Sequence, residues 1–294
     1  MIRRAVLALA IAACGGGDDD PAAPDASTVD PRPDAPPGCT RPALDPGVIG
    51  PYVQQTVTEL AASPRATTTE REAARTYLTQ QLAAAGWTPT LQIYAGGANV
   101  VADIPATMGA DPRIVVGAHF DTVSGSPGAN DNASGVAVVL AVARLLADVP
   151  CRRSPVSIVL FDQEELGLFG SRAFAQTLAP ADVLAVHTID QVSWDSDGDR
   201  VFELELPTPA LEQAWRAAAQ VIGVTVVRTS TSGTDHEAFR DRGFAAVGLT
   251  EEFVGGDTSP FRHQSGDTAA TVDADYLTLA ARLTAQVVIE QTSL

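Results

Sequence analysis

The sequence has few basic residues, with 19 lysines and arginines against 36 aspartates and glutamates, and its formal net charge is −17. No stripe of basic side chains reverses this charge locally. Phosphate backbones would repel such a surface, so the composition argues against a nucleic-acid partner. The acidic charge by itself identifies no substrate, because many exported proteins are kept soluble by surface carboxylates.

The apolar run at residues 5–13 is too short to span a bilayer. Arg3 and Arg4 precede it and small residues lead into Cys14, which is typical of a secretory signal. The ending Ile11-Ala12-Ala13-Cys14 resembles a bacterial lipoprotein signal, in which the signal is removed and Cys14 is lipidated. An ordinary signal peptide is the alternative. A hydrophilic spacer follows Cys14 at once, which favours a protein anchored to the cell envelope.

Three cysteines are too few for a cysteine-rich scaffold. If Cys14 carries lipid, Cys39 and Cys151 remain, and export places them in an oxidising compartment. We therefore expect a disulfide between them. Zinc binding by these cysteines is the weaker alternative, because neither lies in a Cys-x-x-Cys pair or near the histidines considered below.

Large apolar residues are almost absent from residues 15–47, which are mainly Gly, Asp, Pro and Ala. Such a segment cannot bury enough surface to offset its ordering entropy, so we expect a disordered tether after the signal at 1–14. The remaining residues, 48–294, suffice for one sizeable α/β domain but not for two ordinary enzyme domains. We find no internal repeat.

Within 48–294, apolar stretches of strand length alternate with helical patterns. Strands are predicted at 91–94, 99–104, 114–118, 156–161, 183–189 and 245–249. Helices are predicted at 52–62, 70–85, 134–147, 171–178, 209–221 and 274–290. This alternation predicts a three-layer α/β/α sandwich with a mixed, mostly parallel sheet. Ligands bind at the carboxyl ends of strands in such folds, which is where chemistry is expected.

Acidic and imidazole side chains follow three of the predicted strands directly. His119 and Asp121 follow the third strand, Glu164 and Glu165 the fourth, and Asp190 the fifth. Carboxylates crowded at one rim would repel one another unless a cation neutralised them. Imidazole and carboxylate together form a ligand set that suits zinc.

A segment of small residues, 128–135, lies between a strand end and a predicted helix, and Asp131 is its acidic member. Its small residues allow the backbone to approach closely. Asp131 alone could be an ordinary helix cap. Its occurrence together with the strand-end residues favours a metal site.

These motifs, in this order, resemble the secreted dizinc aminopeptidase family, which includes bacterial leucyl aminopeptidases and glutamate carboxypeptidase. The resemblance covers about residues 48–294 and implies the zinc exopeptidase fold. It rests on His119-x-Asp121, Gly128-Ala129-Asn130-Asp131-Asn132-Ala133-Ser134-Gly135, Glu164-Glu165-x-Gly167-Leu168-x-Gly170-Ser171, Asp190 and His263.

The resemblance implies a role for each matched residue. Asp131 would bridge two zinc ions, with His119 and Asp190 completing one site and Glu165 and His263 the other. Glu164 would be the general base. Adjacent residues at a strand end point in opposite directions, so we expect Glu164 and Glu165 to separate in this way. Two such ions would polarise the scissile carbonyl and activate the attacking water.

Several further residues are expected to support the site. Asp121 is predicted to orient His119, the alternative being a loop carboxylate without a role. The resemblance implies a cis peptide bond between Asp131 and Asn132. Asp235 and His236 match a stretch near the family's substrate pocket and are expected to give support without binding zinc. His187, inside an apolar strand, is predicted to be a core residue.

One position departs from the family. Relatives commonly carry tyrosine before the last histidine ligand, where its hydroxyl stabilises the tetrahedral intermediate, whereas this chain has Arg262. Arg262 could replace the tyrosine electrostatically or could point into solvent. The sequence leaves both open.

We expect a monomeric aminopeptidase with two zinc ions that acts on peptide substrates and meets a membrane only through Cys14. A glutaminyl cyclase-like acyltransferase with one zinc is the alternative of the same fold. A carboxypeptidase would recognise the substrate carboxylate with arginines and usually carries an inserted domain, which this chain lacks. A non-catalytic ectodomain would have lost ligands, whereas all five and the base are present.

Overall fold

The computed structural model describes residues 38–109 and 111–293 of the chain. The predicted signal at 1–14, the lipidation site Cys14 and most of the predicted tether lie outside the described residues. Within the described part, one sheet has eight strands in the order β1-β2-β4-β3-β5-β8-β6-β7. They are β1 (Thr90–Tyr94), β2 (Gly97–Ile104), β3 (Arg113–His119), β4 (Val156–Phe161), β5 (Val183–Ile189), β6 (Val201–Glu205), β7 (Thr225–Thr229) and β8 (Ala246–Thr250).

The sheet is mixed, as the sequence predicts. β4, β3, β5 and β8 run parallel in the centre. A β1–β2 hairpin joins β4 in antiparallel fashion on one side, and β6 pairs antiparallel with β8 on the other. The central parallel strands therefore direct their carboxyl ends to one rim, as the prediction of a strand-end site requires.

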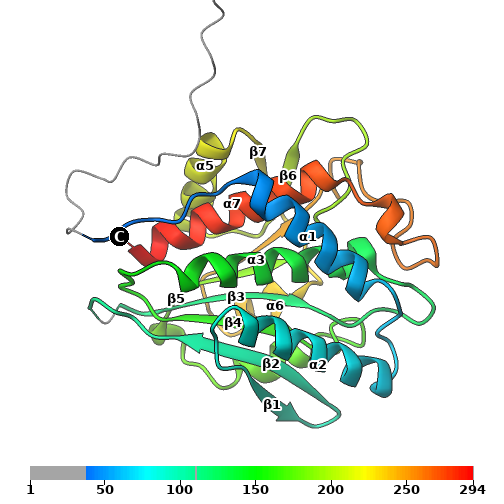
Figure 1. Cartoon of the computed structure of the whole chain (residues 1–294), viewed down its shortest axis with the longest axis horizontal. Helices are drawn as coiled ribbons and strands as arrows, with labels where there is room; N and C mark the ends of the chain where they lie inside the picture. Colours follow the sequence, from blue (N-terminus) through cyan, green and yellow to red (C-terminus); the bar gives the residue numbers. More distant parts are fainter. Residues whose placement is uncertain (1–37, 110, 294) are drawn as a thin grey trace, which may run out of the picture.

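Helices cover both faces of the sheet. Figure 1 shows α1, α3 and α7 side by side over one face, and a core cluster places α2 and α5 on the same face. A second cluster packs α4 and α6 on the opposite face. The helices are α1 (Pro46–Leu60), α2 (Thr68–Ala84), α3 (Gly135–Ala147), α4 (Phe169–Ala175), α5 (Pro209–Ile222), α6 (Asp235–Arg240) and α7 (Ala274–Ser293). The arrangement is the predicted three-layer α/β/α sandwich.

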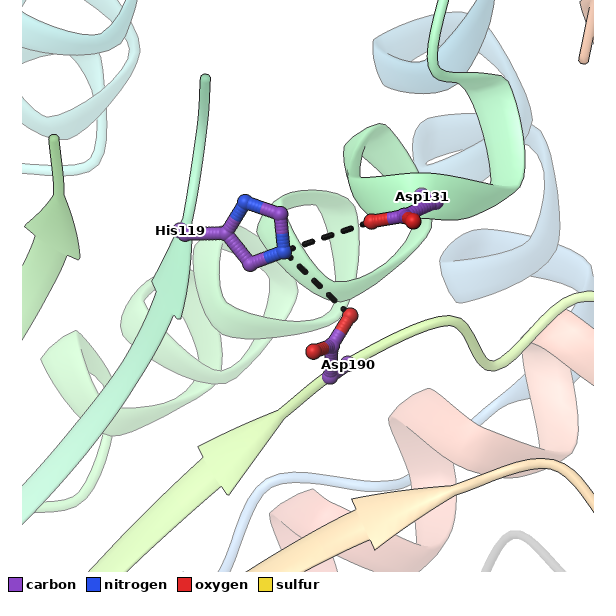
Figure 2. Close-up of side chains that lie close together, drawn as sticks. All are labelled: His119, Asp131 and Asp190. Carbon is purple, nitrogen blue, oxygen red and sulfur yellow. Dashed lines mark hydrogen bonds and ion pairs between the residues drawn. The ribbon is translucent and has the colours of Figure 1, made fainter. Parts of the chain in front are cut away.

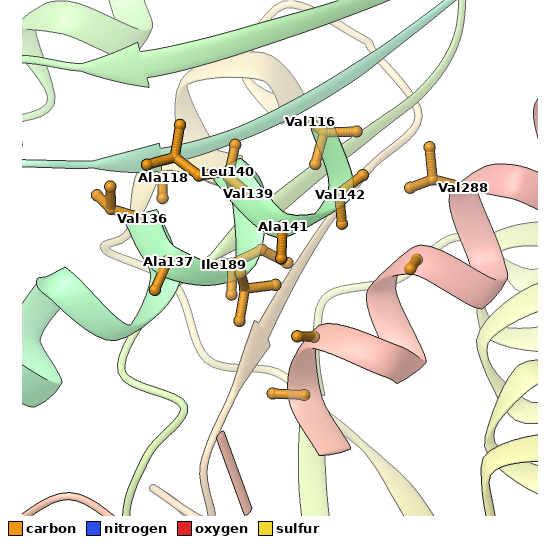
Figure 3. Close-up of a cluster of buried hydrophobic side chains, with 14 of the residues drawn as sticks. Val116, Ala118, Val136, Ala137, Val139, Leu140, Ala141, Val142, Ile189 and Val288 are labelled. Atoms are coloured by element: carbon orange, nitrogen blue, oxygen red, sulfur yellow. The ribbon is translucent and has the colours of Figure 1, made fainter. Parts of the chain in front are cut away.

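Helix α3 is apolar around most of its circumference because it is covered on several sides. Figure 3 shows its Val139, Leu140 and Val142 among Val116 of β3 and Val288 of α7. The three α3 side chains are at most 1% exposed. Burying side chains of this size stabilises the fold by about 1.5–3 kcal/mol each. This packing fixes the N-terminus of α3 against the strand ends. Residues 127–134, which directly precede α3 and carry Asp131, are called the Asp131 segment below.

Two strands and one helix escaped the sequence analysis. β6 has the sequence Val-Phe-Glu-Leu-Glu, and its Glu203 and Glu205 are 2% exposed. Glu203 accepts hydrogen bonds from the backbone of Val254 and Gly255. Glu205 accepts a hydrogen bond from Thr234. Both acids therefore find partners inside the protein, whereas their alternation with Phe202 and Leu204 is typical of a strand buried on one face only. β7 pairs with β6, and α6 has six residues, too few for a clear helical period.

The predicted disulfide between Cys39 and Cys151 is present, and it closes a loop with a sequence separation of 112. Cys151 lies just before β4, so the bond is at the end of the sheet opposite the carboxyl rim. Figure 1 shows the start of the described chain, in blue, beside the C-terminus. An ion pair between Arg41 and Glu290 links the same two segments. Among the described residues, none of the helices is long and apolar enough to cross a membrane.

Candidate metal centre

Three predicted ligands from separate segments meet at the carboxyl rim. Figure 2 shows His119 at the end of β3, Asp131 before α3 and Asp190 after β5, with their side chains converging. Nε2 of His119 lies 3.3 Å from Oδ1 of Asp131 and 3.3 Å from Oδ1 of Asp190. All three residues are buried. The structure therefore brings together the ligands expected for the first metal ion.

The ligands expected for the second ion also meet, on the other oxygen of Asp131. Nε2 of His263 lies 3.1 Å from Oδ2 of Asp131 and 3.1 Å from Oε2 of Glu165. Within each group of three residues, one ligand atom per residue lies within 4.8 Å of the others. Asp131 belongs to both groups, which is the arrangement a bridging carboxylate needs.

The Asp131 segment depends on small residues, as predicted. A Cβ at Gly135 would lie 2.4 Å from the carbonyl oxygen of Ile189, and a Cβ at Gly128 would lie 2.5 Å from the carbonyl oxygen of Asp131. Gly128 also has a φ of +63°, which favours glycine. The peptide bond between Asp131 and Asn132 is cis, which confirms that prediction.

Glu164 and Glu165 lie beyond the strand, which differs from the expected geometry. β4 ends at Phe161, and the backbone amides of Gly167 and Leu168 donate to the carbonyl of Glu164, so the two acids begin a turn. The prediction that strand alternation separates their side chains is therefore wrong. Oε2 of Glu164 lies 4.0 Å from Nε2 of His119, whereas Glu165 contacts His263.

Asp121 contacts both His119 and the turn that carries Glu164 and Glu165. Its carboxylate accepts hydrogen bonds from the backbone amides of Glu164, at 3.0 Å, and Glu165, at 3.2 Å. Nδ1 of His119 lies 3.2 Å from the carbonyl oxygen of Asp121 and 3.5 Å from its Oδ1. Asp121 is thus close enough to orient His119, and its carboxylate also holds the turn that carries both glutamates.

The other three residues that were expected to support the site, Arg262, Asp235 and His236, differ in their contacts with the metal centre. Nε of Arg262 lies 3.4 Å from Oδ2 of Asp131, and its guanidinium stacks over Phe253, so this side chain reaches the site although it is 42% exposed. Asp235 is buried, and burial is the main cause that raises its pKa to about 7. His236 contacts Thr234 and Glu205 instead and belongs to neither ligand group.

His187 is the core residue that the sequence predicts. It is fully buried, with Nε2 bonded to Gln291 at 2.8 Å, and Trp215 donates to its Nδ1 at 3.2 Å. Burial lowers its pKa to about 4. The neutral ring satisfies both nitrogens within the fold, so His187 takes no part in the site.

Three buried residues around Asp131 were not predicted from the sequence: Arg65, Glu251 and Asp267. Glu251 accepts hydrogen bonds from Asn130, Ser259 and Trp194, and joins the loops beside the site. Arg65 and Asp267 bind the backbone of the Asp131 segment and are described below. Arg65 gives no local signal, because its partners at the site are the backbone carbonyls of Phe120, Pro127 and Gly128, far away in the chain. Asp267 could have been noticed as an acid four residues after His263.

The donor set fits a divalent cation. Burial is the largest cause that raises the pKa of Glu164 and of Glu165, and neighbouring carboxylates add to it. Among the described residues, Oε1 of Glu165 is a buried oxygen without a hydrogen-bond partner. Two imidazoles with carboxylates suit zinc, and a cation would relieve both the repulsion and the orphaned oxygen.

Two other acidic groups are more exposed. They comprise Asp195, Asp197 and Asp257, and Asp197, Asp199 and Glu252. The carboxylate of Asp257 already accepts hydrogen bonds from the indole of Trp194 and the backbone and hydroxyl of Ser196. Neither group includes a histidine. The buried centre at the strand ends is therefore the candidate for catalysis.

Stripping metal with a chelator is expected to leave a protein that becomes less stable as the pH rises. Glu164 and Glu165 have an ordinary pKa of 4.5, which burial raises to about 10 and about 7 in the folded chain. A group with a raised pKa stabilises the fold fully below its unfolded pKa, and this contribution is lost as the pH rises through the folded pKa. The loss should run from about pH 4.5 to 7 for Glu165 and to 10 for Glu164. Urea unfolding of the chelated protein at pH 5.5 and 8.5 would measure it.

Two lowered pKa values act in the opposite sense. That of Asp131 acts only below its ordinary value of 3.8 and leaves the comparison between pH 5.5 and 8.5 unaffected. That of His187, which burial lowers from 6.5 to about 4, adds stability as the pH rises from 5.5 to 6.5 and offsets part of the loss. A higher free energy of unfolding at pH 8.5 than at pH 5.5 would contradict the prediction. Adding zinc at pH 8.5 should restore stability, because the cation favours the ionised carboxylates.

The profile of peptidase family M28 matches residues 99–288. Leupeptin-inactivating enzyme 1 of Streptomyces exfoliatus is 34% identical over 187 residues, which cover 59% of this chain and 41% of that protein. The probable lipoprotein aminopeptidase LpqL of Mycobacterium tuberculosis is 29% identical, over 55% of this chain and 36% of that protein. The chain thus spans less than half of the length of these relatives.

Solved structures share the fold. An aminopeptidase from Aneurinibacillus superposes with a TM-score of 0.74 at 16% identity, over 83% of this chain and 94% of that chain. A zinc aminopeptidase from Bacillus subtilis gives 0.62 at 25% identity, over 67% and 50%. A glutaminyl cyclase from Porphyromonas gingivalis gives 0.69 at 20% identity, over 84% and 99%. The zinc aminopeptidase and the donor set together support zinc as the metal.

Proposed function

Because this chain belongs to peptidase family M28, we propose that it is a zinc-dependent aminopeptidase that removes N-terminal residues from peptides. One observation carries the proposal: two groups of histidine and carboxylate ligands share Asp131, and Glu164 stands beside them. We assign Asp131 as the bridge between two zinc ions. His119 and Asp190 complete one site, and Glu165 and His263 complete the other.

Zinc in such a pair supplies Lewis acidity, which polarises the peptide carbonyl and lowers the pKa of water. The chain itself supplies the proton transfer. Glu164 accepts the proton of the attacking water on a side-chain oxygen and delivers it to the leaving amine. Burial and neighbouring carboxylates raise the pKa of Glu164, and nearby cations would lower it towards the operating pH.

The surrounding residues hold these groups in place. Asp121 fixes the backbone of Glu164 and Glu165 and orients His119. Arg262 places a positive charge beside Asp131, where it can stabilise an oxyanion in place of the tyrosine of relatives. Asp235 adds negative charge near Glu164, and the neighbouring His236 is held by Glu205 and Thr234.

The ring of carboxylates favours an α-ammonium group over an α-carboxylate as the recognised end of the substrate. One of the two bacterial relatives, LpqL, is named as a probable lipoprotein aminopeptidase, which supports this choice. The glutaminyl cyclases share the fold at 20–21% identity. Two overlapping ligand groups favour the aminopeptidase, because the cyclase alternative needs one zinc.

We also propose that the chain is exported and held at the cell envelope through Cys14, with 48–294 as the catalytic domain. The signal-like N-terminus and the lipoprotein aminopeptidase among the relatives support this location. The disulfide is consistent with an oxidising compartment.

The purified chain is expected to hold two zinc ions and to release the first residue of peptides with a free N-terminus. Acetylating the N-terminus should abolish release, because no α-ammonium remains for the carboxylates to bind. Elemental analysis and mass spectrometry of the products measure both. Release from the C-terminal end of acetylated peptides would indicate a carboxypeptidase, and one zinc with cyclisation of N-terminal glutamine would indicate a cyclase.

A further inference from the structure

Asp267 is a fully buried acid whose carboxylate binds the backbone of the Asp131 segment. Its Oδ1 accepts the amide of Asn130 at 2.7 Å, and its Oδ2 accepts the amide of Asp131 at 3.0 Å. Its carbonyl oxygen accepts the amide of Ala129 at 3.2 Å. Three successive amides of this segment are therefore held by one residue.

Arg65 holds the same segment from another direction. Its guanidinium donates to the carbonyls of Pro127, at 2.7 Å, and Gly128, at 2.8 Å. It also donates to the carbonyl of Phe120 at 2.6 Å, next to His119. Burial raises the pKa of Asp267, and the amides of Asn130 and Asp131 and the positive charge of Arg65 offset part of this rise. The buried acid thus has both hydrogen-bond donors and a countercharge.

The chemistry of this contact requires a carboxylate. Two backbone N–H groups need two acceptor oxygens, whereas an asparagine would turn a donor NH₂ group towards one of them. Asp267 also places a negative charge next to Asp131, which disfavours ionisation of the pair. The hydrogen bonds from both amides and the charge of Arg65 offset part of this repulsion.

Asp267 also links the two halves of the centre. It lies four residues after His263, and its amide donates to Gln264 within the same turn. Asp131 contacts His119 through one oxygen and His263 through the other. A shift of the Asp131 backbone would therefore disturb both ligand groups.

We propose that Asp267 is a positioning residue for the metal centre, which aims the carboxylate of Asp131 at both metal positions by binding the amides of Asn130 and Asp131. The inference rests on the proposed function, since it takes Asp131 as the shared ligand. It concerns the residues that fix the position of the Asp131 carboxylate before metal binds. Residues that orient metal ligands typically change metal affinity by about 10–100-fold when they are replaced.

Asp267→Asn is expected to weaken zinc binding by at least about tenfold, measured by competition with a chromophoric chelator. The absorption spectrum of the cobalt-substituted variant should also change, because it reports ligand geometry. Asp273→Asn is the matched control. Asp273 likewise accepts two backbone amides, those of Asp275 and Tyr276 at the start of α7, but lies in neither ligand group. Its loss should lower the unfolding temperature without changing zinc affinity or the cobalt spectrum.

Wild-type zinc affinity and cobalt spectrum in a folded Asp267→Asn protein would overturn the proposal, even if its unfolding temperature fell. Should that variant fail to fold, hydrogen exchange of the metal-free wild type decides. The amides of Asn130 and Asp131 should be protected before zinc is added, and rapid exchange there would contradict the proposal. If the wild type itself binds no zinc, the proposed function fails instead, which keeps the two failures distinct.

Discussion

Replacing Glu164 by glutamine is expected to lower kcat by about 10²–10⁴-fold while leaving two zinc ions bound. Glutamine keeps the size of the side chain but cannot accept a proton from water. Glu164 belongs to neither ligand group, so its replacement should not release metal. Steady-state kinetics on a peptide with a free N-terminus, together with elemental analysis, would measure both effects.

Glu165→Gln is the matched control, because Glu165 is the neighbouring acid but lies among the ligands with Asp131 and His263. It should reduce zinc content as well as activity, and added zinc should recover part of the activity. Glu164→Gln should show no such recovery. A Glu164→Gln enzyme with wild-type kcat would place the general base elsewhere, and one without zinc would make Glu164 a ligand.

Removing the disulfide by Cys39→Ser and Cys151→Ser is expected to lower the free energy of unfolding by about 2–5 kcal/mol. The bond closes a loop with a sequence separation of 112, and a cross-link over about 100 residues restricts the unfolded chain by about 4.7 kcal/mol in the chain-entropy account. Urea unfolding of the double variant and of the parent would measure the loss. The parent treated with reductant provides a second comparison.

The same double variant should retain the kcat of the parent under conditions where both are folded. The bond lies at the amino end of β4, whereas Glu164 and the ligands lie beyond the carboxyl ends of the strands. An unchanged free energy of unfolding would show that the N-terminal segment is held by its packing alone. A large loss of kcat at full folding would contradict the separation of the two regions.

Much of the fold could be predicted because each central strand or helix has the apolar pattern of its own kind of element. β4 and β5 have the predicted bounds, and α3 and α7 begin within one residue of the prediction. Their apolar runs face the core, so sequence and burial agree. β6 could not be found in this way, since its buried Glu203 and Glu205 are satisfied by partners that come later in the chain.

The residues of the candidate site likewise fall into those that the sequence predicts and those that it does not. His119, Asp190 and the Glu164-Glu165 pair are visible in the sequence because each lies at the end of an apolar strand or within four residues of it. Arg65 and Asp267 are not, because their function is to bind backbone groups of segments that only the fold brings near. The separation of Glu164 from Glu165 was expected for the wrong reason, since a turn and not a strand positions them. The ligands are thus readable from local sequence, whereas the scaffold around them is not.

The disulfide also fixes the place on the domain from which the N-terminal segment leaves. Anything joined to the chain ahead of Cys39 meets the domain beside Cys151, at the amino end of β4. The ligand residues open at the opposite rim of the sheet. Attachment from the N-terminal side would therefore lie away from the ligand residues, so that the point of attachment would not block the approach of peptides to them.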